Sequence, residues 1–304
     1  MSTHKKLKNL EQQLSVVATE PVHHPLLEKK DLQLFIKRED RLHPIVSGNK
    51  WRKLKYILQH AIETKHDHLI SMGGVWSNHL HALAWVGKEL GLRTTGIIRG
   101  ELPDEKPSTL IEVEEWGMQL EFVSRLEFRK LREFHEHDSE PAEHYNGYWI
   151  PEGGANKLAL RGVAEVVNEI ELSFDTIALA CGTGTTLAGI ASVLPADKNT
   201  IGFAVLKGAS FLQDDVRALL KDYDQKNWSI NLDYHFGGFA KTDQKLFSFM
   251  EDFEKQTGIP LEPVYTGKML YGLFDLIKQD MFESGQKIIA IHTGGLQGKS
   301  GFQR

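Results

Sequence analysis

The sequence predicts an α/β protein in which parallel strands form open sheets with helices on their faces. Apolar runs of strand length alternate with segments of helical periodicity, and several of those runs end in glycine-rich turns. A repeated order of strand, turn and helix is typical of parallel sheets. Because such sheets gather their ligands at the carboxyl ends of the strands, we expect the glycine turns to share one site.

The expected elements follow one another in a regular order. Residues 31–40 form a strand-like run, and residues 50–65 have the periodicity of an amphipathic helix. Three later stretches place a glycine turn after a strand: HLISMGGVWSNHLHALAWVGKELGL at 68–92, with the next strand at 94–100, then DTIALACGTGTTLAGIASVL at 175–194 and KIIAIHTGGLQG at 287–298. Residues 125–146 are highly polar with few apolar side chains, which is typical of a surface helix or a mobile cover.

Composition limits the class of protein. With 304 residues, 41% hydrophobic and 25% charged, the chain can bury a globular core without metals or disulfides. A net charge of -5 without a dense run of Lys and Arg disfavours nucleic acid as a partner. No stretch has the apolar length of a membrane span or a signal sequence, so we expect a cytoplasmic protein with no membrane partner. Cys181 is the only cysteine, and we expect it to be a small buried residue outside any disulfide.

The first candidate for chemistry is Lys50, in the segment SGNKWRKL at 47–54. It follows a tight turn and stands at the start of the expected helix. Helix starts carry partial positive charge, so a lysine there is disfavoured unless an anion faces it. Taken alone, a lysine beside a glycine is usually a solvated surface residue.

The second candidate is the turn CGTGTT at 181–186, between an expected strand and an expected helix. Its two glycines permit unusual backbone angles, and its exposed amides and threonine hydroxyls could cradle one phosphate. It lacks the lysine of a P-loop, and Leu187 stands where a dinucleotide-binding turn has its third glycine. An ordinary strand-to-helix turn is the alternative interpretation.

The third candidate is GGVWSNHLH at 73–81, where Ser77 or Asn78 is suited to cap the following helix. Capping does not account for the cluster of Trp76 to His79, whose side chains suit a small-ligand pocket. His79 with His81, and His135 with His137 and Asp138, lack a standard zinc spacing, so we expect no metal site.

Together, a turn-borne lysine, a phosphate-sized loop and several hydroxyl-bearing turns fit a phosphorylated aldehyde cofactor. The motifs SGNKWRKL, GGVWSNH, CGTGTT, VYTGK and HTGG occur in this order, and through them the chain resembles the 1-aminocyclopropane-1-carboxylate deaminase and D-cysteine desulfhydrase family over residues 35–298. The resemblance implies pyridoxal 5'-phosphate as cofactor and the tryptophan-synthase-β-like fold (PLP fold type II), with two open twisted sheets flanked by helices. It also implies a homodimer, a large domain of residues 1–50 and 158–304, and a small domain of residues 51–157.

The resemblance also assigns roles to residues. Lys50 would form the Schiff base with the cofactor, and Ser77 and Tyr265 would join it in catalysis. The remaining cofactor contacts would come from Lys53, Asn78, Cys181, Gly182, Thr183, Gly184, Thr185, Thr186 and Thr266. The substrate contacts would come from Trp76, Ser77, Asn78, His79, Phe239, Tyr265, Thr293 and Gly294.

One position bears on the substrate. Deaminases of this family that open the cyclopropane ring carry a Glu after the motif tyrosine, whereas this chain has Thr266. A carboxylate stabilises a protonated pyridine ring and a hydroxyl does not, so Thr266 favours β-elimination from D-cysteine over ring opening. The segment HFGGFAKTD at 235–243, with Phe239, also departs from the tyrosine-bearing loop of the family.

Three alternatives stay open beside a D-cysteine desulfhydrase. One is a 1-aminocyclopropane-1-carboxylate deaminase, which acts on a different small amino acid. The second is a binding protein that keeps the fold but not the chemistry, although such a protein would have little reason to keep both Lys50 and Ser77. The third, a dehydrogenase, is disfavoured by Leu187.

Overall fold

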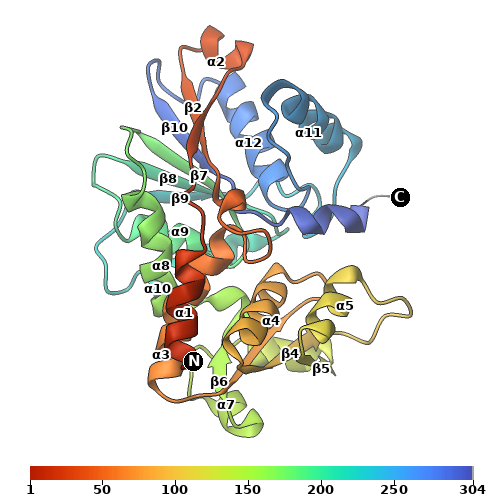
Figure 1. The fold of residues 1–304 in the computed structure, drawn as a ribbon. Helices are drawn as coiled ribbons and strands as arrows, with labels where there is room; N and C mark the ends of the chain where they lie inside the picture. The colour runs from red at the N-terminus through yellow and green to blue at the C-terminus, as the bar shows by residue number, and fades with distance from the viewer. Residues whose placement is uncertain (303–304) are drawn as a thin grey trace. The chain divides into compact units, whose positions relative to one another are not determined.

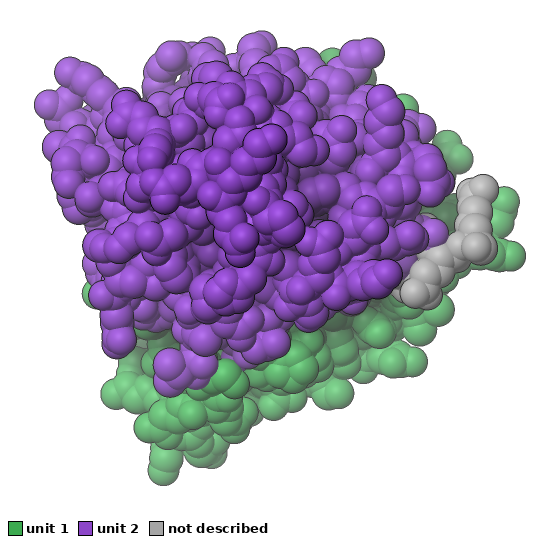
Figure 2. Space-filling view, turned by 90° about the horizontal axis from the view of Figure 1, so that it is seen from above, with its two compact units in different colours: residues 1–15, 43–162 green, residues 16–42, 163–304 purple. Residues whose placement is uncertain are grey.

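A computed structural model describes residues 1–302. The chain forms two compact units, coloured separately in Figure 2. Unit 1 contains residues 1–15 and 43–162, and unit 2 contains residues 16–42 and the chain from 163 onward. The domain boundaries expected from the sequence, at residues 50 and 157, stay a prediction.

Unit 1 contains a four-stranded sheet in the order β5-β4-β3-β6, in which every neighbouring pair is parallel. Its strands are β3 (His68–Gly73), β4 (Arg93–Arg99), β5 (Met118–Val123) and β6 (Tyr148–Ile150). The helices α3 (Asn49–Glu63), α4 (Asn78–Leu90) and α5 (Ser108–Glu115) pack together, with α4 on β3 and β4 (Figure 1). Strand β3 is buried along its whole length, as expected for a strand covered on both faces.

The polar segment 125–146 contains α6 (Arg125–Leu131) and α7 (Glu140–Tyr145). Its few apolar residues, among them Phe128 and Phe134, pack with Ile70, Ile97 and Trp149 of the sheet. The Trp149 indole donates a hydrogen bond to the Phe134 carbonyl at 2.9 Å, and the Trp149 amide donates one to the His137 carbonyl at 3.0 Å. The segment therefore consists of surface helices attached to the sheet, which is one of the two expected interpretations.

Unit 2 contains a six-stranded sheet in the order β1-β2-β10-β7-β8-β9, which is parallel except for the edge pair β1 and β2. Its strands are β1 (Thr19–Val22), β2 (Gln33–Lys37), β7 (Thr176–Cys181), β8 (Asn199–Ala204), β9 (Trp228–Asn231) and β10 (Lys287–Ile291). Alternate residues of β7 point to opposite faces of the sheet. Ala178 and Ala180 belong to the core shared with α11 (Gln244–Thr257) and α12 (Thr266–Lys278). Figure 1 shows α12 beside this sheet.

The other helices connect or cover these sheets. They are α1 (Thr3–Gln12), α2 (Pro25–Lys29), α8 (Lys157–Asn168), α9 (Thr185–Ala191) and α10 (Leu212–Leu219). Four short 3-10 helices lie at Glu39–Arg41, Glu152–Gly154, Ala209–Phe211 and Leu296–Phe302. Within residues 1–302, every helix is too short or too polar to traverse a lipid bilayer.

Most expected elements are confirmed. The strands at 31–40, 68–73, 94–100 and 176–181 and the late strand before HTGG are present, and each glycine turn follows the carboxyl end of a strand. Ser77 caps α4, and Cys181 is buried and outside any disulfide. The antiparallel edge strand β1 was not expected, because its four residues contain a proline and carry no clear alternation.

Gly162 in α8 offers a test of the packing in unit 1. A Cβ added there would overlap the Arg52 carbonyl oxygen, which is backbone and cannot move aside easily. Helix propensity alone would make Gly162→Ala stabilising by about 1 kcal/mol. We expect it instead to lower the free energy of unfolding by about 1–3 kcal/mol, the usual cost of overpacking, in urea denaturation. Asn168→Ala at the exposed end of the same helix is the control, and a stabilised Gly162→Ala protein would contradict this packing.

Candidate active site

The start of α3 forms the first part of the candidate site in unit 1. Gly48, with φ 63°, turns the chain into the helix, in which Lys50 is the second residue and Lys53 the fifth. Lys50 is half-buried, whereas Lys53 is 3% exposed and donates to the Gly153 carbonyl oxygen at 3.2 Å. Gly154 lies against the same side chain, since a Cβ there would be 3.4 Å from the Lys53 Cβ. The turn at 152–154 thus approaches Lys53 closely.

The start of α4 forms the second part. The Ser77 hydroxyl accepts the Leu80 amide N–H at 3.2 Å, which caps the helix. Gly73 leaves room for this cap, because a Cβ there would come within 2.5 Å of the Ser77 Oγ. Ser77 and Asn78 are partly exposed, and Trp76 is 40% exposed. A strand-end glycine and a capping serine therefore place these three side chains at the carboxyl end of β3.

His79 is the buried member of this group. Its Nε2 lies 2.9 Å from the Ser71 Oγ, and that hydroxyl donates to the Ile150 carbonyl at 2.8 Å. Because the serine proton is used there, Ser71 must accept from His79, which places the imidazole proton on Nε2. Burial lowers the pKa of His79 well below its usual range, and the charges of Lys50 and Lys53 lower it further. The ring is therefore neutral, and within the described chain its buried Nδ1 has no hydrogen-bond partner.

In unit 2 the turn 181–186 leads from β7 into α9. Gly184, with φ 74°, precedes the helix, and the hydroxyls of Thr183 and Thr185 lie 2.9 Å apart. Thr185 and Thr186 are buried, whereas Gly182 and Thr183 are partly exposed. The first amides of a helix have no acceptor within it, so this turn offers N–H groups to an anion. A Cβ on Gly182 would lie 3.2 Å from the Tyr265 ring, so the ring packs directly on the turn.

Glu262 organises the start of α12 and was not predicted. Its carboxylate is 2% exposed and accepts the amide N–H groups of Val264 at 2.8 Å, Tyr265 at 2.7 Å and Thr266 at 2.5 Å. Burial raises the pKa of Glu262, and these three hydrogen bonds oppose that shift. The position of Tyr265 thus depends on a buried carboxylate three residues earlier.

Thr266 is fully buried, with its hydroxyl bonded to Glu262. The hydroxyl oxygen accepts the Glu262 amide N–H at 3.1 Å, and Oγ1 lies 3.2 Å from a Glu262 carboxylate oxygen. A hydroxyl has one proton, so donation to a ring nitrogen would require the bond to the carboxylate to break. The role of Thr266 as a cofactor contact stays a prediction.

Two other buried side chains, Lys268 and His292, were not predicted from the sequence. The Lys268 ammonium, on α12, donates to the carbonyl oxygens of His235 and Gly238 in the loop that carries Phe239. His292 precedes Thr293 and Gly294, and its Nε2 lies 2.7 Å from the Pro260 carbonyl. Its Nδ1 accepts the Gly294 amide at 3.3 Å, and burial lowers its pKa, so the ring is neutral. A lysine in the first turn of an expected helix is the one sequence signal that could have drawn attention to Lys268.

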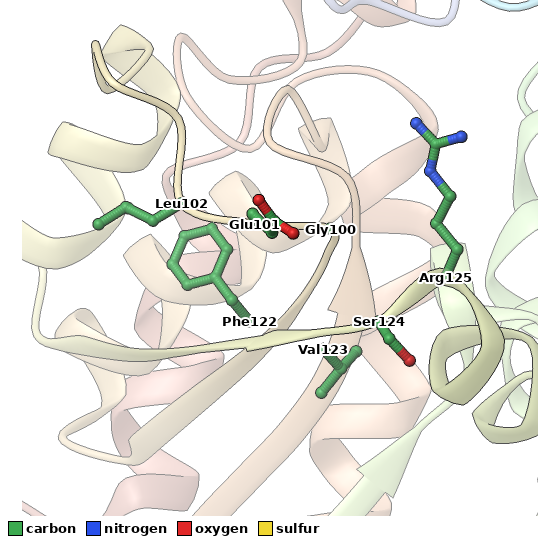
Figure 3. A pocket seen from close by; sticks show the side chains of 7 residues that line it. All are labelled: Gly100, Glu101, Leu102, Phe122, Val123, Ser124 and Arg125. Atoms are coloured by element: carbon green, nitrogen blue, oxygen red, sulfur yellow. The ribbon is translucent and has the colours of Figure 1, made fainter.

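The structure brings the predicted residues together in two groups. In unit 1, Lys50, Lys53 and His79 form one group with the nearby cap of α4, and in unit 2 the turn 182–186, Tyr265 and Phe239 form the other. A hollow of about 670 Å³ in unit 1 contains none of the predicted residues (Figure 3). It lies at the carboxyl ends of strands β4 and β5 and is lined by Gly100, Glu101, Leu102, Phe122, Val123, Ser124 and Arg125.

These groups fit pyridoxal phosphate. The glycine turn at 182–184 presents backbone to an anion where side chains would fill the space, and Tyr265 packs beside it with a flat ring. Lys50 supplies a half-buried amine, and the buried Nδ1 of His79 is an acceptor within the same unit. The Lys50 amine suits the aldehyde of the cofactor, and the backbone amides of the turn suit its phosphate. The neutral His79 ring suits a hydrogen-bond donor of an amino acid.

Known proteins support this fit. Residues 14–294 match the sequence profile of the family described as pyridoxal-phosphate dependent enzyme. The mitochondrial bifunctional D-cysteine desulfhydrase/1-aminocyclopropane-1-carboxylate deaminase of Arabidopsis thaliana is 34% identical, over 88% of this chain and 73% of its own length. A D-cysteine desulfhydrase of Klebsiella pneumoniae is 28% identical, over 86% of this chain and 87% of its own. A crystal structure described as an ACC deaminase homologue has a TM-score of 0.78 and 28% identity, over 97% of this chain and 96% of that one.

The neutral state of His79 predicts how stability depends on pH. Its folded pKa lies below the usual 6.5, so below that pH the unfolded chain binds a proton that the folded chain does not. Stability is therefore lost as pH falls, by up to about 1.4 kcal/mol per pH unit for this one group. We expect His79→Gln, which keeps a donor for Ser71, to reduce the slope between pH 6.5 and 5 in urea denaturation. The exposed His135→Gln variant is the control, and equal slopes in all three proteins would exclude a neutral buried His79.

Proposed function

Because the chain belongs to the pyridoxal-phosphate-dependent enzyme family, we propose that it is a lyase or deaminase acting on a small amino acid, with D-cysteine as its preferred substrate. The likeness to a solved relative confirms the predicted tryptophan-synthase-β-like fold, and the family confirms pyridoxal phosphate as cofactor. The proposed reaction converts D-cysteine and water into pyruvate, sulfide and ammonia.

The cofactor, when bound, withdraws electrons from the α-carbon of an amino acid joined to it. In this proposal Lys50 would hold the cofactor through its aldehyde, and the Lys50 amine would take the proton from the substrate α-carbon. By the family resemblance, Lys53 and the turn Gly182 to Thr186 would hold the phosphate, and Asn78 would bond the ring oxygen. Ser77 receives the substrate carboxylate, beside a His79 that is neutral and can accept a hydrogen bond there.

The observation that carries the choice of substrate is the environment of Thr266. A hydroxyl follows Tyr265, and the carboxylate bonded to that hydroxyl, Glu262, is buried and already accepts three backbone N–H groups. This start of α12 therefore supplies no carboxylate to protonate a pyridine nitrogen. Ring opening of the cyclopropane substrate breaks a carbon-carbon bond without an α-proton and needs strong electron withdrawal, whereas D-cysteine has an α-proton and a good leaving group.

The same-class alternative is hydrolytic deamination of 1-aminocyclopropane-1-carboxylate to 2-oxobutyrate. It is favoured by the names of the relatives, since the Arabidopsis protein is named for both activities and the solved neighbour for the deaminase. A non-catalytic binding protein is disfavoured because the chain keeps Lys50 and Ser77 together. From the family resemblance we also propose a homodimer in the cytoplasm.

We expect the purified enzyme to release sulfide from D-cysteine faster than it forms 2-oxobutyrate from the cyclopropane amino acid. The ratio of kcat/KM values should be at least about 100, or ~2.7 kcal/mol in the barrier, which is the usual worth of one preorganised charge interaction. Steady-state rates on both substrates measure this, with L-cysteine as the control for stereochemistry. A ratio near one or below it would overturn the substrate assignment, and no activity on any small amino acid would overturn the enzyme assignment.

A further inference from the structure

Lys268 is a fully buried lysine on α12. Its ammonium donates to the carbonyl oxygens of His235 at 2.9 Å and Gly238 at 2.8 Å, in a loop some thirty residues earlier in the chain. A buried ammonium is costly unless its protons find acceptors, so these two bonds are what permit a lysine here. Burial lowers the pKa of Lys268 to about 8, and the negative charge of Glu262 raises it.

The two carbonyl groups also close the turns of the loop. The Gly238 amide donates to the His235 carbonyl at 3.0 Å, and the Lys241 amide donates to the Gly238 carbonyl at 3.1 Å. Lys268 therefore binds the acceptor of each of two successive turns and joins them to α12. A third bond, from the Gly237 amide to the His235 ring at 2.9 Å, lies within the loop.

The backbone of this loop needs such support. Gly237 and Gly238 have φ values of 90° and 124°, and the non-glycine residues Phe236 and Ala240 have φ values of 52° and 54°. Left-handed backbone costs a non-glycine residue roughly 1–2 kcal/mol and persists only where neighbouring structure enforces it. The ammonium of Lys268 supplies that constraint between the two strained residues.

The loop ends in an aromatic contact with the candidate site. The Phe239 ring is 44% exposed and meets the Tyr265 ring edge to face, with centroids 6.1 Å apart. Tyr265 in turn packs on Gly182 of the glycine-rich turn. Phe236 of the same loop makes an edge contact with Tyr271 of α12, with ring centroids 4.9 Å apart. The position of Phe239 beside Tyr265 thus follows from how α12 holds the loop.

We propose that Lys268 is a positioning residue, which holds the loop 235–241 so that Phe239 forms a wall beside Tyr265 and selects the side chain of the substrate amino acid. The proposal rests on the proposed function, because it takes Phe239 and Tyr265 as substrate contacts. Lys268 itself does not touch the substrate. It acts through the two carbonyl groups and the shape they give to the loop.

The experiment compares the holoenzyme with Lys268→Met, which removes the donors, and Lys268→Gln, which keeps neutral donors. The matched control is Lys241→Met, the same substitution at an exposed position of the same loop. Hydrogen exchange of amides 236–241 should become about 10-fold to 100-fold faster in Lys268→Met, and less so in Lys268→Gln, as expected for the loss of charged hydrogen bonds. Amides near the end of α12 should keep their rates.

The KM for D-cysteine should rise about 10-fold or more while kcat changes far less, because a substrate wall is lost and the reacting groups are retained.

The outcomes distinguish three claims: that Lys268 anchors the loop, that the loop selects the substrate, and that the protein is the proposed enzyme. Unchanged exchange of the loop in both Lys268 variants, or faster exchange spread evenly over α11, α12 and the loop, would overturn the anchoring role. Faster exchange confined to the loop with an unchanged KM would overturn the selection role. Absence of activity on all small amino acids in the unmodified enzyme would instead overturn the proposed function, and the exchange rates would still decide whether Lys268 holds the loop.

Discussion

Lysines in the first turn of a helix impose the main electrostatic constraint on this protein. The amide groups there carry partial positive charge, so a cation in that turn destabilises the helix unless acceptors or anions surround it. Such lysines occur in several helices of the described chain. Among them, Lys50 of α3 is half-buried and Lys268 of α12 is fully buried, whereas Lys157 of α8 and Lys245 of α11 are exposed. Around the starts of α3 and α12, backbone carbonyl groups accept hydrogen bonds from buried lysines and so stabilise their charge.

In α12, other groups of the chain compensate the charge of Lys268. The Glu262 carboxylate binds the first amides of the helix and lies near Lys268, whose protons go to two loop carbonyls. These two buried charged groups thereby fix the helix start, Tyr265 and the loop with Phe239. Buried polar networks of this kind favour one arrangement, because removing a member leaves its buried partner unpaired. A second buried group, His292 between Pro260 and Gly294, holds the neighbouring turn.

At the start of α3, a backbone carbonyl and a neutral histidine lie beside the lysines. Lys53 donates to the Gly153 carbonyl, and His79 nearby is held neutral by burial and by the two lysine charges. An enzyme that uses a phosphorylated aldehyde has reason to keep positive charge and an amine at such a place, since the aldehyde reacts with the amine and the phosphate is an anion. Lys268, fully buried and bonded to two carbonyls, is a poor nucleophile by comparison, although both lysines begin helices.

The sequence predicted the regular parts of this arrangement well. Glycine turns after buried strands, the Ser77 cap and the burial of Cys181 all follow from local pattern, and the structure has them. The roles of Glu262 and Lys268 could not be predicted, because each depends on backbone groups brought close by the tertiary fold. The hydroxyl of Thr266 faces Glu262 for the same reason, which no alternation or spacing reveals. The assigned site residues, by contrast, rest on motif resemblance and stay predictions.

The identity of the cofactor lysine is the central claim, and mapping it by borohydride reduction is its most direct measurement. The protein loaded with pyridoxal phosphate is reduced, digested and analysed by mass spectrometry, with Lys50→Ala as the control variant. The account predicts one modified peptide, labelled at Lys50 and absent from the variant, with Lys53 and Lys268 unmodified. A label on Lys268 or any other lysine, or loaded protein with no label at all, would contradict it.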